Sequence, residues 1–165
     1  GSTFASTGAV IDLQVEGQPM GSELRLKGNG GTVEFEVVAE SVFPLTGVEI
    51  VVNGEQVARE ESEYGDTSMR FKHKIKTEKS CWVVARCWGS HYTDAGPVMA
   101  HSSPVYIDVG RRCAFVEAEG NYLMTHMEGG IAWAESIGVF RDEGVRQRLI
   151  GLFDEAKREL IRRMS

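Results

Sequence analysis

Cysteine, proline and long apolar runs are all scarce in this chain. Three cysteines and four prolines occur in 165 residues. Three cysteines are too few for a disulfide-rich scaffold. An odd number of cysteines also points to a reducing compartment. No apolar run approaches the roughly 20 residues that a membrane-spanning helix needs. We therefore expect neither a disulfide framework nor a membrane span.

Excess positive charge is absent as well. The chain has 18 Lys and Arg against 24 Asp and Glu, a formal net charge of −6. Non-specific binding to nucleic acid depends on clustered cations that neutralise phosphates. We therefore expect no nucleic-acid partner.

Motifs for nucleophilic and nucleotide chemistry are missing too. There is no Gly-x-Ser-x-Gly sequence of the kind that carries a hydrolase nucleophile. The glycine-rich run at residues 28–31 lies between two predicted strands and does not open a helix, so it is a turn rather than a phosphate loop. The chain is also too short for a complete hydrolase barrel of about 250 residues.

The composition that is present changes near residue 110. Residues 1–110 are rich in Val, Thr and Gly and carry the whole net charge, whereas residues 111–165 are rich in Ala, Glu, Arg and Leu and are neutral. The first composition favours strands and the second favours helices. The change predicts a β domain followed by a helical segment.

Alternating apolar and polar residues predict seven or eight short strands in the first part. The clearest runs are residues 9–15, 24–26, 32–39, 48–52, 69–75, 81–88 and 105–109. Asn53-Gly54 between two such runs is a strong hairpin signature. Residues 81–88 are apolar on both sides except at Arg86, which predicts a central strand covered on two faces. The pattern is typical of an immunoglobulin-like antiparallel β-sandwich.

Two helices are predicted after the sandwich, over residues 115–137 and 142–163. Gly129-Gly130 is a point at which the first helix could be either interrupted or continuous. In the second helix, apolar residues recur every three or four positions: Val145, Leu149, Leu152, Ala156, Leu160 and Met164. The fold class is thus mainly β with α, a sandwich followed by a C-terminal helical hairpin. The predicted division is 1–8 as an exit segment headed by a Gly1-Ser2 tag scar, 9–110 as the sandwich, and 111–165 as the hairpin.

The cysteines Cys81 and Cys87 fall on one predicted strand. At about 3.3 Å per residue they lie roughly 20 Å apart, and a disulfide requires Cα atoms within about 7 Å. They cannot pair with each other, so we expect small buried thiols.

Residues 89–101, interpreted as a loop, hold weak candidates for a metal site. Two imidazoles and a carboxylate, His91, Asp94 and His101, are of the types that bind zinc or iron. Their spacing matches no strict metal motif, and polar residues are common in solvated loops. The two interpretations are a small self-sufficient hydrolase centred on these residues and a loop with no metal.

Aromatic residues suggest a ligand site. Trp82, Arg86 and Trp88 share one face of the predicted strand, with Tyr92 beyond it, and could form a platform on which a sugar stacks. Alternatively, Trp82 packs in the core.

A row of four cations, Arg70, Lys72, Lys74 and Lys76, could hold an acidic polymer. However, Glu34 and Glu36 offer cross-strand partners for these cations. A solvated face of paired charges is therefore the simpler interpretation.

Several segments resemble a known family in their order along the chain. They are residues 3–8, 17–21, 43–45, 48–54, 82–86 and 100–107, followed by Tyr122-Leu123, Trp133 and Phe140. This ordered set resembles the C-terminal portion of CehA/McbA-type metallohydrolases, which belong to the PHP (polymerase and histidinol phosphatase) superfamily. In that family a barrel with a His-x-His motif precedes this portion and binds divalent metals. The resemblance therefore places the metals and the catalysis outside this sequence.

The resemblance implies a non-catalytic accessory domain. Such a domain would pack on its own N-terminal PHP barrel, shape substrate access or mediate homo-oligomerisation. It would have no cofactor and no catalytic residue of its own, with divalent metals in the barrel. The alternative is a β-sandwich module that binds a carbohydrate or another cell-envelope ligand through Trp82, Arg86, Trp88 and Tyr92.

Overall fold

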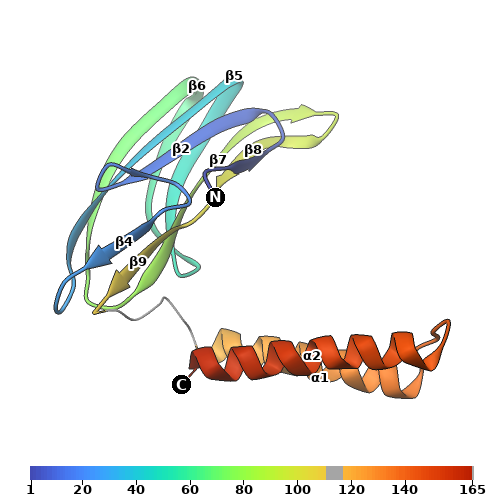
Figure 1. The fold of residues 1–165 in the computed structure, drawn as a ribbon. Coiled ribbons are helices and arrows are strands. Elements are labelled where there is room, and N and C mark those ends of the chain that lie inside the picture. The colour runs from blue at the N-terminus through green and yellow to red at the C-terminus, as the bar shows by residue number, and fades with distance from the viewer. Residues whose placement is uncertain (111–116, 165) are drawn as a thin grey trace. The chain divides into compact units, whose positions relative to one another are not determined.

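The structure is a computed structural model that describes residues 1–110 and 117–164. The chain forms two compact units, divided between residues 114 and 115. The first is a β-sandwich of nine strands (Figure 1). Their bounds are β1 Phe4–Ser6, β2 Ala9–Val15, β3 Gln18–Pro19, β4 Glu23–Leu26, β5 Gly31–Val52, β6 Glu55–Thr77, β7 Cys81–Thr93, β8 Gly96–Ser102 and β9 Val105–Val109.

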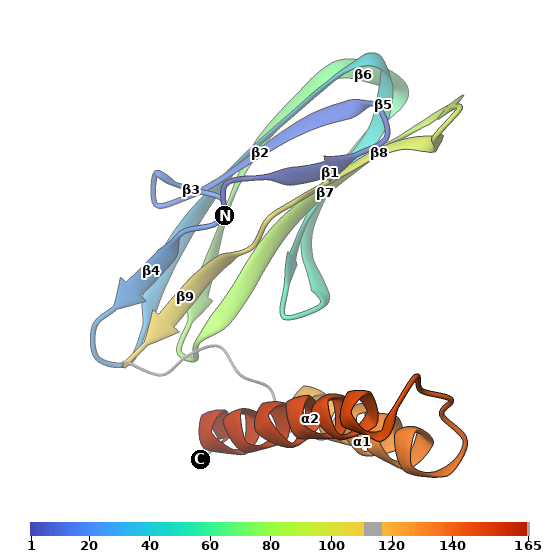
Figure 2. The same ribbon diagram turned by 45° about the vertical axis from the view of Figure 1, so that its right-hand side comes forward.

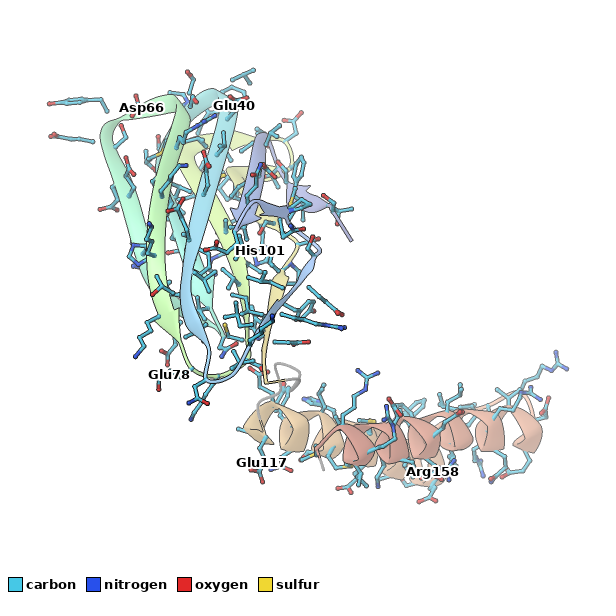
Figure 3. The ribbon with its side chains drawn as sticks, turned by 60° about the vertical axis from the view of Figure 1, so that its left-hand side comes forward. Glu40, Asp66, Glu78, His101, Glu117 and Arg158 are labelled. Atoms are coloured by element: carbon cyan, nitrogen blue, oxygen red, sulfur yellow. The ribbon has the colours of Figure 1, made fainter. Side chains whose placement is uncertain are left out.

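Two long strands, β5 and β6, build both layers of the sandwich. They pair antiparallel along almost their whole length, with register shifts between Glu40 and Leu45. Before this bend β5 also pairs with β2, and after it β5 pairs with β7. Figure 3 labels Glu40 and Asp66 at the bend and Glu78 at the other end of these strands. One continuous ribbon therefore folds over to supply strands to two facing layers.

Alternate side chains from both layers fill the core between them. Ile11, Leu13, Val33, Phe35 and Val37 come from one layer, and Leu45, Val48, Ile50, Val83 and Ile107 are among those from the other. All are at most 1% exposed. The alternation of the sequence thus identifies the inward faces, and the predicted sandwich of immunoglobulin-like kind is confirmed, with one parallel pair, β4 with β9, in an otherwise antiparallel sheet.

The predicted row of cations lies on the solvent face of β6, opposite the acidic face of β5. Lys74 Nζ lies 2.9 Å from Glu34, and Lys72 Nζ lies 3.0 Å from Glu36. Arg70 also reaches Glu36, at 3.5 Å. These cations have carboxylate partners within the sheet, so the row is a paired face and does not present unbalanced positive charge.

Three sequence-based expectations need correction in this unit. Residues 89–101 are not a loop, because β7 continues to Thr93 and β8 begins at Gly96. Residues 81–88 are fully covered on one face only: on the other, Val84 is buried, Trp82 and Trp88 are half-buried and Arg86 is exposed. Phe4–Ser6, in the segment set apart as an exit, pairs with β8 and belongs to the sheet.

The thiols of Cys81 and Cys87 are free and buried, as expected. Burial raises the pKa of Cys87 to about 11 and also raises the pKa of Cys81. A thiol in this state is protonated at neutral pH and reacts poorly as a nucleophile. Both residues are packing residues.

The second unit is an antiparallel helical hairpin of α1 (Glu117–Ser136) and α2 (Glu143–Met164), shown in Figure 2. Phe153 of α2 packs where a side chain on Gly130 of α1 would lie, and Lys157 Nζ lies 3.1 Å from Glu128. These contacts fix the register of the two helices. No described helix is long and apolar enough to cross a membrane.

The structure decides one open point about the helices and corrects one expectation. Gly129-Gly130 does not interrupt α1, which is continuous, because the small Gly130 gives Phe153 room to pack against the helix. The predicted stripe of α2 is only partly inward: Leu160 is buried, but Leu152 is 64% exposed.

The Asn53-Gly54 turn gives a first prediction. Both residues have positive φ, 49° and 88°, as a two-residue hairpin turn of type I′ requires. Gly54→Ala meets no atom within 4 Å, yet places a Cβ in a strained backbone conformation, so we expect a loss of about 1 kcal/mol in the free energy of unfolding. Gly31→Ala, also in open space but without positive φ, is the matched control and should be neutral or stabilising in urea titrations. Equal losses in the two variants would contradict the turn assignment.

Acid pH should weaken the C-terminal end of α2. Hydrogen bonds from Arg162 and Arg163 lower the pKa of the Glu159 carboxyl from 4.5 to about 2. Because the folded pKa lies below the unfolded one, the stabilisation is complete above about pH 4.5 and is lost as the pH falls toward 2. Carbon-13 NMR should show Glu159 titrating near pH 2, and Glu159→Gln should reduce the loss of helix ellipticity over that range. A Glu159 midpoint near 4.5 would contradict these ion pairs.

Candidate functional site

The outer face of β7, together with its neighbour β8, carries three of the candidate residues, Arg86, Trp88 and His101. The strand register places Ala5 beside His101, His101 beside Arg86, Arg86 beside Glu49 and Glu49 beside Arg59. This row runs across five neighbouring strands, from β1 to β6, on the face turned away from the core. Figure 3 labels His101 within it.

Glu49 is the unusual member of the row, because it is a carboxylate that is only 6% exposed. Arg86 Nε donates a hydrogen bond of 2.7 Å to Glu49 Oε1, and Arg86 Nη2 also contacts this oxygen. A buried carboxylate needs such a partner, because its desolvation is otherwise unfavourable by several kcal/mol. The pair holds the Arg86 guanidinium in one orientation while the arginine side chain stays about half exposed.

The Trp88 indole lies flat against the sheet beside this row. Its ring fills the space that a side chain on Gly47 would occupy. The guanidinium carbon of Arg59 lies over the indole, 4.7 Å from its centre. Because of this cation–π contact, a sugar that stacks on the same face of Trp88 has to displace Arg59.

A groove of about 530 Å³ runs between the Trp88 indole and the edge strand β1. Thr7, which directly follows β1, is held at its rim, where its amide donates a 3.0 Å hydrogen bond to Met99 O. The lining residues are Ala5, Ser6, Thr7, Glu49, Arg86, Cys87, Trp88, Met99, Ala100 and His101. The groove is therefore mainly apolar, with Arg86 and His101 as its cationic and imidazole groups. Its volume is within the range of about 300–1,000 Å³ typical of ligand sites.

The four predicted ligand residues are only partly brought together. Trp82, Arg86 and Trp88 share the outer face of β7, but only Arg86 and Trp88 line the groove. Trp82 instead pairs across the strands with Tyr106 of β9. Tyr92 lies near the tip of the β7–β8 hairpin and is 72% exposed. The four residues therefore do not form one continuous platform.

The weak metal candidates do not converge. The His91 ring stacks on Phe43, with ring centres 4.0 Å apart, and His101 Nδ1 lies 2.7 Å from the backbone oxygen of Ser102. Asp94 lies at the tip of the hairpin, between β7 and β8. Among residues 1–110 and 117–164, no group of three His, Cys, Asp or Glu side chains is placed to hold a metal ion. Strand pairing in β7 and β8 thus separates the three residues that the sequence places close together.

Sequence reasoning missed three contributors to the groove: Glu49, Met99 and the β1 residues. Glu49 alternates with the inward residues Val48 and Ile50 and therefore takes an outward position, where a carboxylate is ordinary. No local pattern indicates that this outward carboxylate is buried. Met99 was not identified because residues 96–102, which form β8, were interpreted as part of a loop. The β1 residues pair with a strand about 100 positions away, which no local pattern reveals.

Comparisons with known proteins give matches among solved structures. No protein-family model and no curated protein matches it. A solved structure of a lytic polysaccharide monooxygenase from Jonesia denitrificans is similar with 15% identity and a TM-score of 0.34, over 53% of this chain and 58% of that one. A Niemann-Pick type C2 protein from the Japanese carpenter ant is similar with 9% identity and a TM-score of 0.36, over 64% of this chain and 99% of that one. Similarities at this level carry no inference about function.

The seat of Trp88 gives a prediction for the site. Gly47→Ala puts a methyl group where the indole lies, so the ring must leave the sheet and Arg59, and we expect a loss of about 1–3 kcal/mol in the free energy of unfolding. The tryptophan emission should shift to longer wavelength as the indole becomes more exposed. Gly31→Ala on the same strand is the control and should leave the emission unchanged. An unaltered spectrum in Gly47→Ala would contradict the described seat.

Proposed function

We propose that this chain is the non-catalytic C-terminal accessory region of a PHP-type metal-dependent hydrolase, and that the groove is the surface through which its sandwich packs on the barrel. One observation carries the proposal: residues 5–7 form one side of the groove. The resemblance to CehA/McbA-type enzymes puts these same residues at the exit from the barrel. A domain joined at this point is held next to the groove by the chain itself, which makes the effective concentration high.

The chemistry of the groove suits a protein surface as its occupant. Its apolar residues, Ala5, Met99 and Trp88, resemble the core of a protein interface. Glu49 orients the Arg86 guanidinium, and the arginine side chain is half exposed. The guanidinium can therefore donate hydrogen bonds to a carboxylate of the partner at one end of the groove. We therefore propose that the barrel contributes an apolar segment with an acidic residue beside it.

The divalent metals belong to the barrel in this proposal. The described residues of this chain gather no set of metal ligands, and Arg86, His101 and Trp88 are assigned to packing and to shaping substrate access. The supporting chemistry is that of the groove, and the hydrolase identity of the partner rests on the family resemblance.

A second candidate function is the binding of a carbohydrate. It is favoured by Trp82 and Tyr106, which are cross-strand neighbours on the outer face. Tyr106 is partly exposed, and adjacent aromatic rings are a common sugar platform. The Arg59 guanidinium over Trp88 disfavours stacking at the groove itself.

The proposal expects a longer reading frame with a His-x-His barrel ahead of Thr3, and the test uses that longer protein. Met99→Lys places a charge in the groove, at a side chain already 48% exposed. We expect the barrel and sandwich of this variant to melt separately in calorimetry, with increased hydrogen exchange in β1 and β8. Val10→Lys, at a 55% exposed apolar residue on the other layer, is the matched control and should melt as the parent does.

Three outcomes would overturn the proposal. They are a reading frame without a barrel upstream, stoichiometric zinc, manganese or iron with ester turnover in the 165-residue chain alone, and identical melting of the Met99→Lys and parent proteins. Calorimetric binding of a glycan that is lost in Trp82→Ala would favour the second candidate.

A further inference from the structure

The helical hairpin has more apolar surface than its own two helices cover. Its seam is formed in α1 by residues at alternating spacings of four and three, Gly120, Met124, Met127, Ile131 and Ala134. The apolar residues of the seam in α2 share one face of that helix: Ile150, Phe153, Leu160 and Met164. Only Gly120, Ala134 and Leu160 are buried in the described helices. Each helix then carries a second apolar stripe next to the seam.

The second stripe of α1 contains Tyr122, Leu123 and Trp133, which are 65%, 50% and 47% exposed. The second stripe of α2 contains Leu149, Leu152 and Ala156, with Leu152 largely exposed. Successive residues of a helix are turned by about 100°, and the antiparallel pairing then puts both stripes on the same side of the hairpin. We call this side the apolar face.

The opposite side of the hairpin is polar. Its residues are Asn121, Thr125, Glu128 and Glu135 of α1, with Gln147, Asp154 and Arg158 of α2. The salt bridge between Glu128 and Lys157 lies toward this side. A helix pair with one polar and one apolar side is a half of a four-helix bundle, because the apolar side requires cover.

We propose that the apolar face binds the same face of a second copy of this chain, so that two hairpins form a four-helix bundle. The area of the face fits this occupant. Helices of about 20 residues are about 30 Å long and about 10 Å wide each, so the face measures about 600 Å². Stable interfaces bury about 800 Å² of accessible surface on each partner, which a corrugated face of this size supplies.

The distribution of charge favours a second copy and sets its orientation. The half of the face nearest the α1–α2 connection holds Trp133, Leu149 and Leu152, with Arg148 at its outer edge. Other charges, among them Glu119 and Arg163, lie at the opposite end of the face. The contact of Gly130 with Phe153 fixes the register of the two helices, and this register puts Glu119 and Arg163 at nearly the same height along the hairpin. A two-fold axis parallel to the helices brings α1 of one copy onto α2 of the other. The apolar halves then meet each other, and Glu119 of each copy faces Arg163 of the second, which also contacts Glu159 of its own helix.

Two exposed alanines give a matched test of this interface. Ala156 lies on the apolar face and Ala132 on the polar side, and both are exposed and helical. We expect light scattering of the parent at tens of micromolar to give twice the 18.2 kDa of one chain. Ala156→Glu should raise the dissociation constant at least tenfold, because it places an uncompensated charge in the interface, whereas Ala132→Glu should leave the dimer unchanged.

Circular dichroism distinguishes dissociation from unfolding. If Ala156→Glu loses helix content at high concentration, Leu152→Gln, a change at an already exposed residue, replaces it as the deciding variant. A parent that stays monomeric at tens of micromolar overturns the proposal, as does equal weakening by Ala132→Glu and Ala156→Glu. The inference rests on the hairpin alone, so loss of the dimer would leave the proposed docking groove untouched, and the reverse also holds.

Discussion

The sandwich depends on the pairing of β5 with β6. These two strands run antiparallel through the bend near Glu40 and Leu45 and supply paired segments to both layers. Every other strand is attached to this ribbon directly or through a neighbour: β2 and β7 pair with β5, and β8 and β9 pair with β7. Because the core lies between the two halves of one ribbon, the two layers are joined by the paired chain at the bend as well as by the core.

The outer surfaces of the two layers use this arrangement differently. On the β2 side, the carboxylates of β5 form ion pairs with the cations of β6 on a solvent-exposed face. On the β7 side, one carboxylate, Glu49, is buried and fixes one guanidinium, leaving apolar side chains beside it. Binding a partner at the first surface would bring little favourable free energy, because its charges are already paired. The second surface has exposed apolar area and one oriented guanidinium that a partner can contact.

Much of the fold follows from local patterns. The period-two alternation locates six of the strands, the Asn53-Gly54 turn joins β5 to β6, and the change in composition near residue 110 marks the helices. Where the patterns fail, a tertiary contact has replaced the local preference. Gly129-Gly130 remains helical because Phe153 packs against Gly130, and residues 89–101 form strands because β8 pairs with both β7 and β1.

The candidate site was less accessible to sequence reasoning than the fold. Arg86 and Trp88 were identified because they share a face of one strand, which period two predicts. Their partners Glu49, Gly47 and Arg59 come from other strands, and register shifts in β5 decide which of them meet. No pattern within a single segment encodes a register between strands, so the groove could not be assembled before the pairing was known.

The place of β1 has a consequence for how the protein is made. Phe4–Ser6 pairs with β8, and the Thr3 hydroxyl lies 2.8 Å from that of Ser103, a hundred residues later in the sequence. Synthesis proceeds from the N-terminus, so β1 leaves the ribosome long before its partner strand exists. Contacts of such long sequence separation form slowly, and an unpaired strand is open to wrong partners in the meantime. The groove side made by β1 is therefore among the last parts of the sandwich to be completed in a newly made chain.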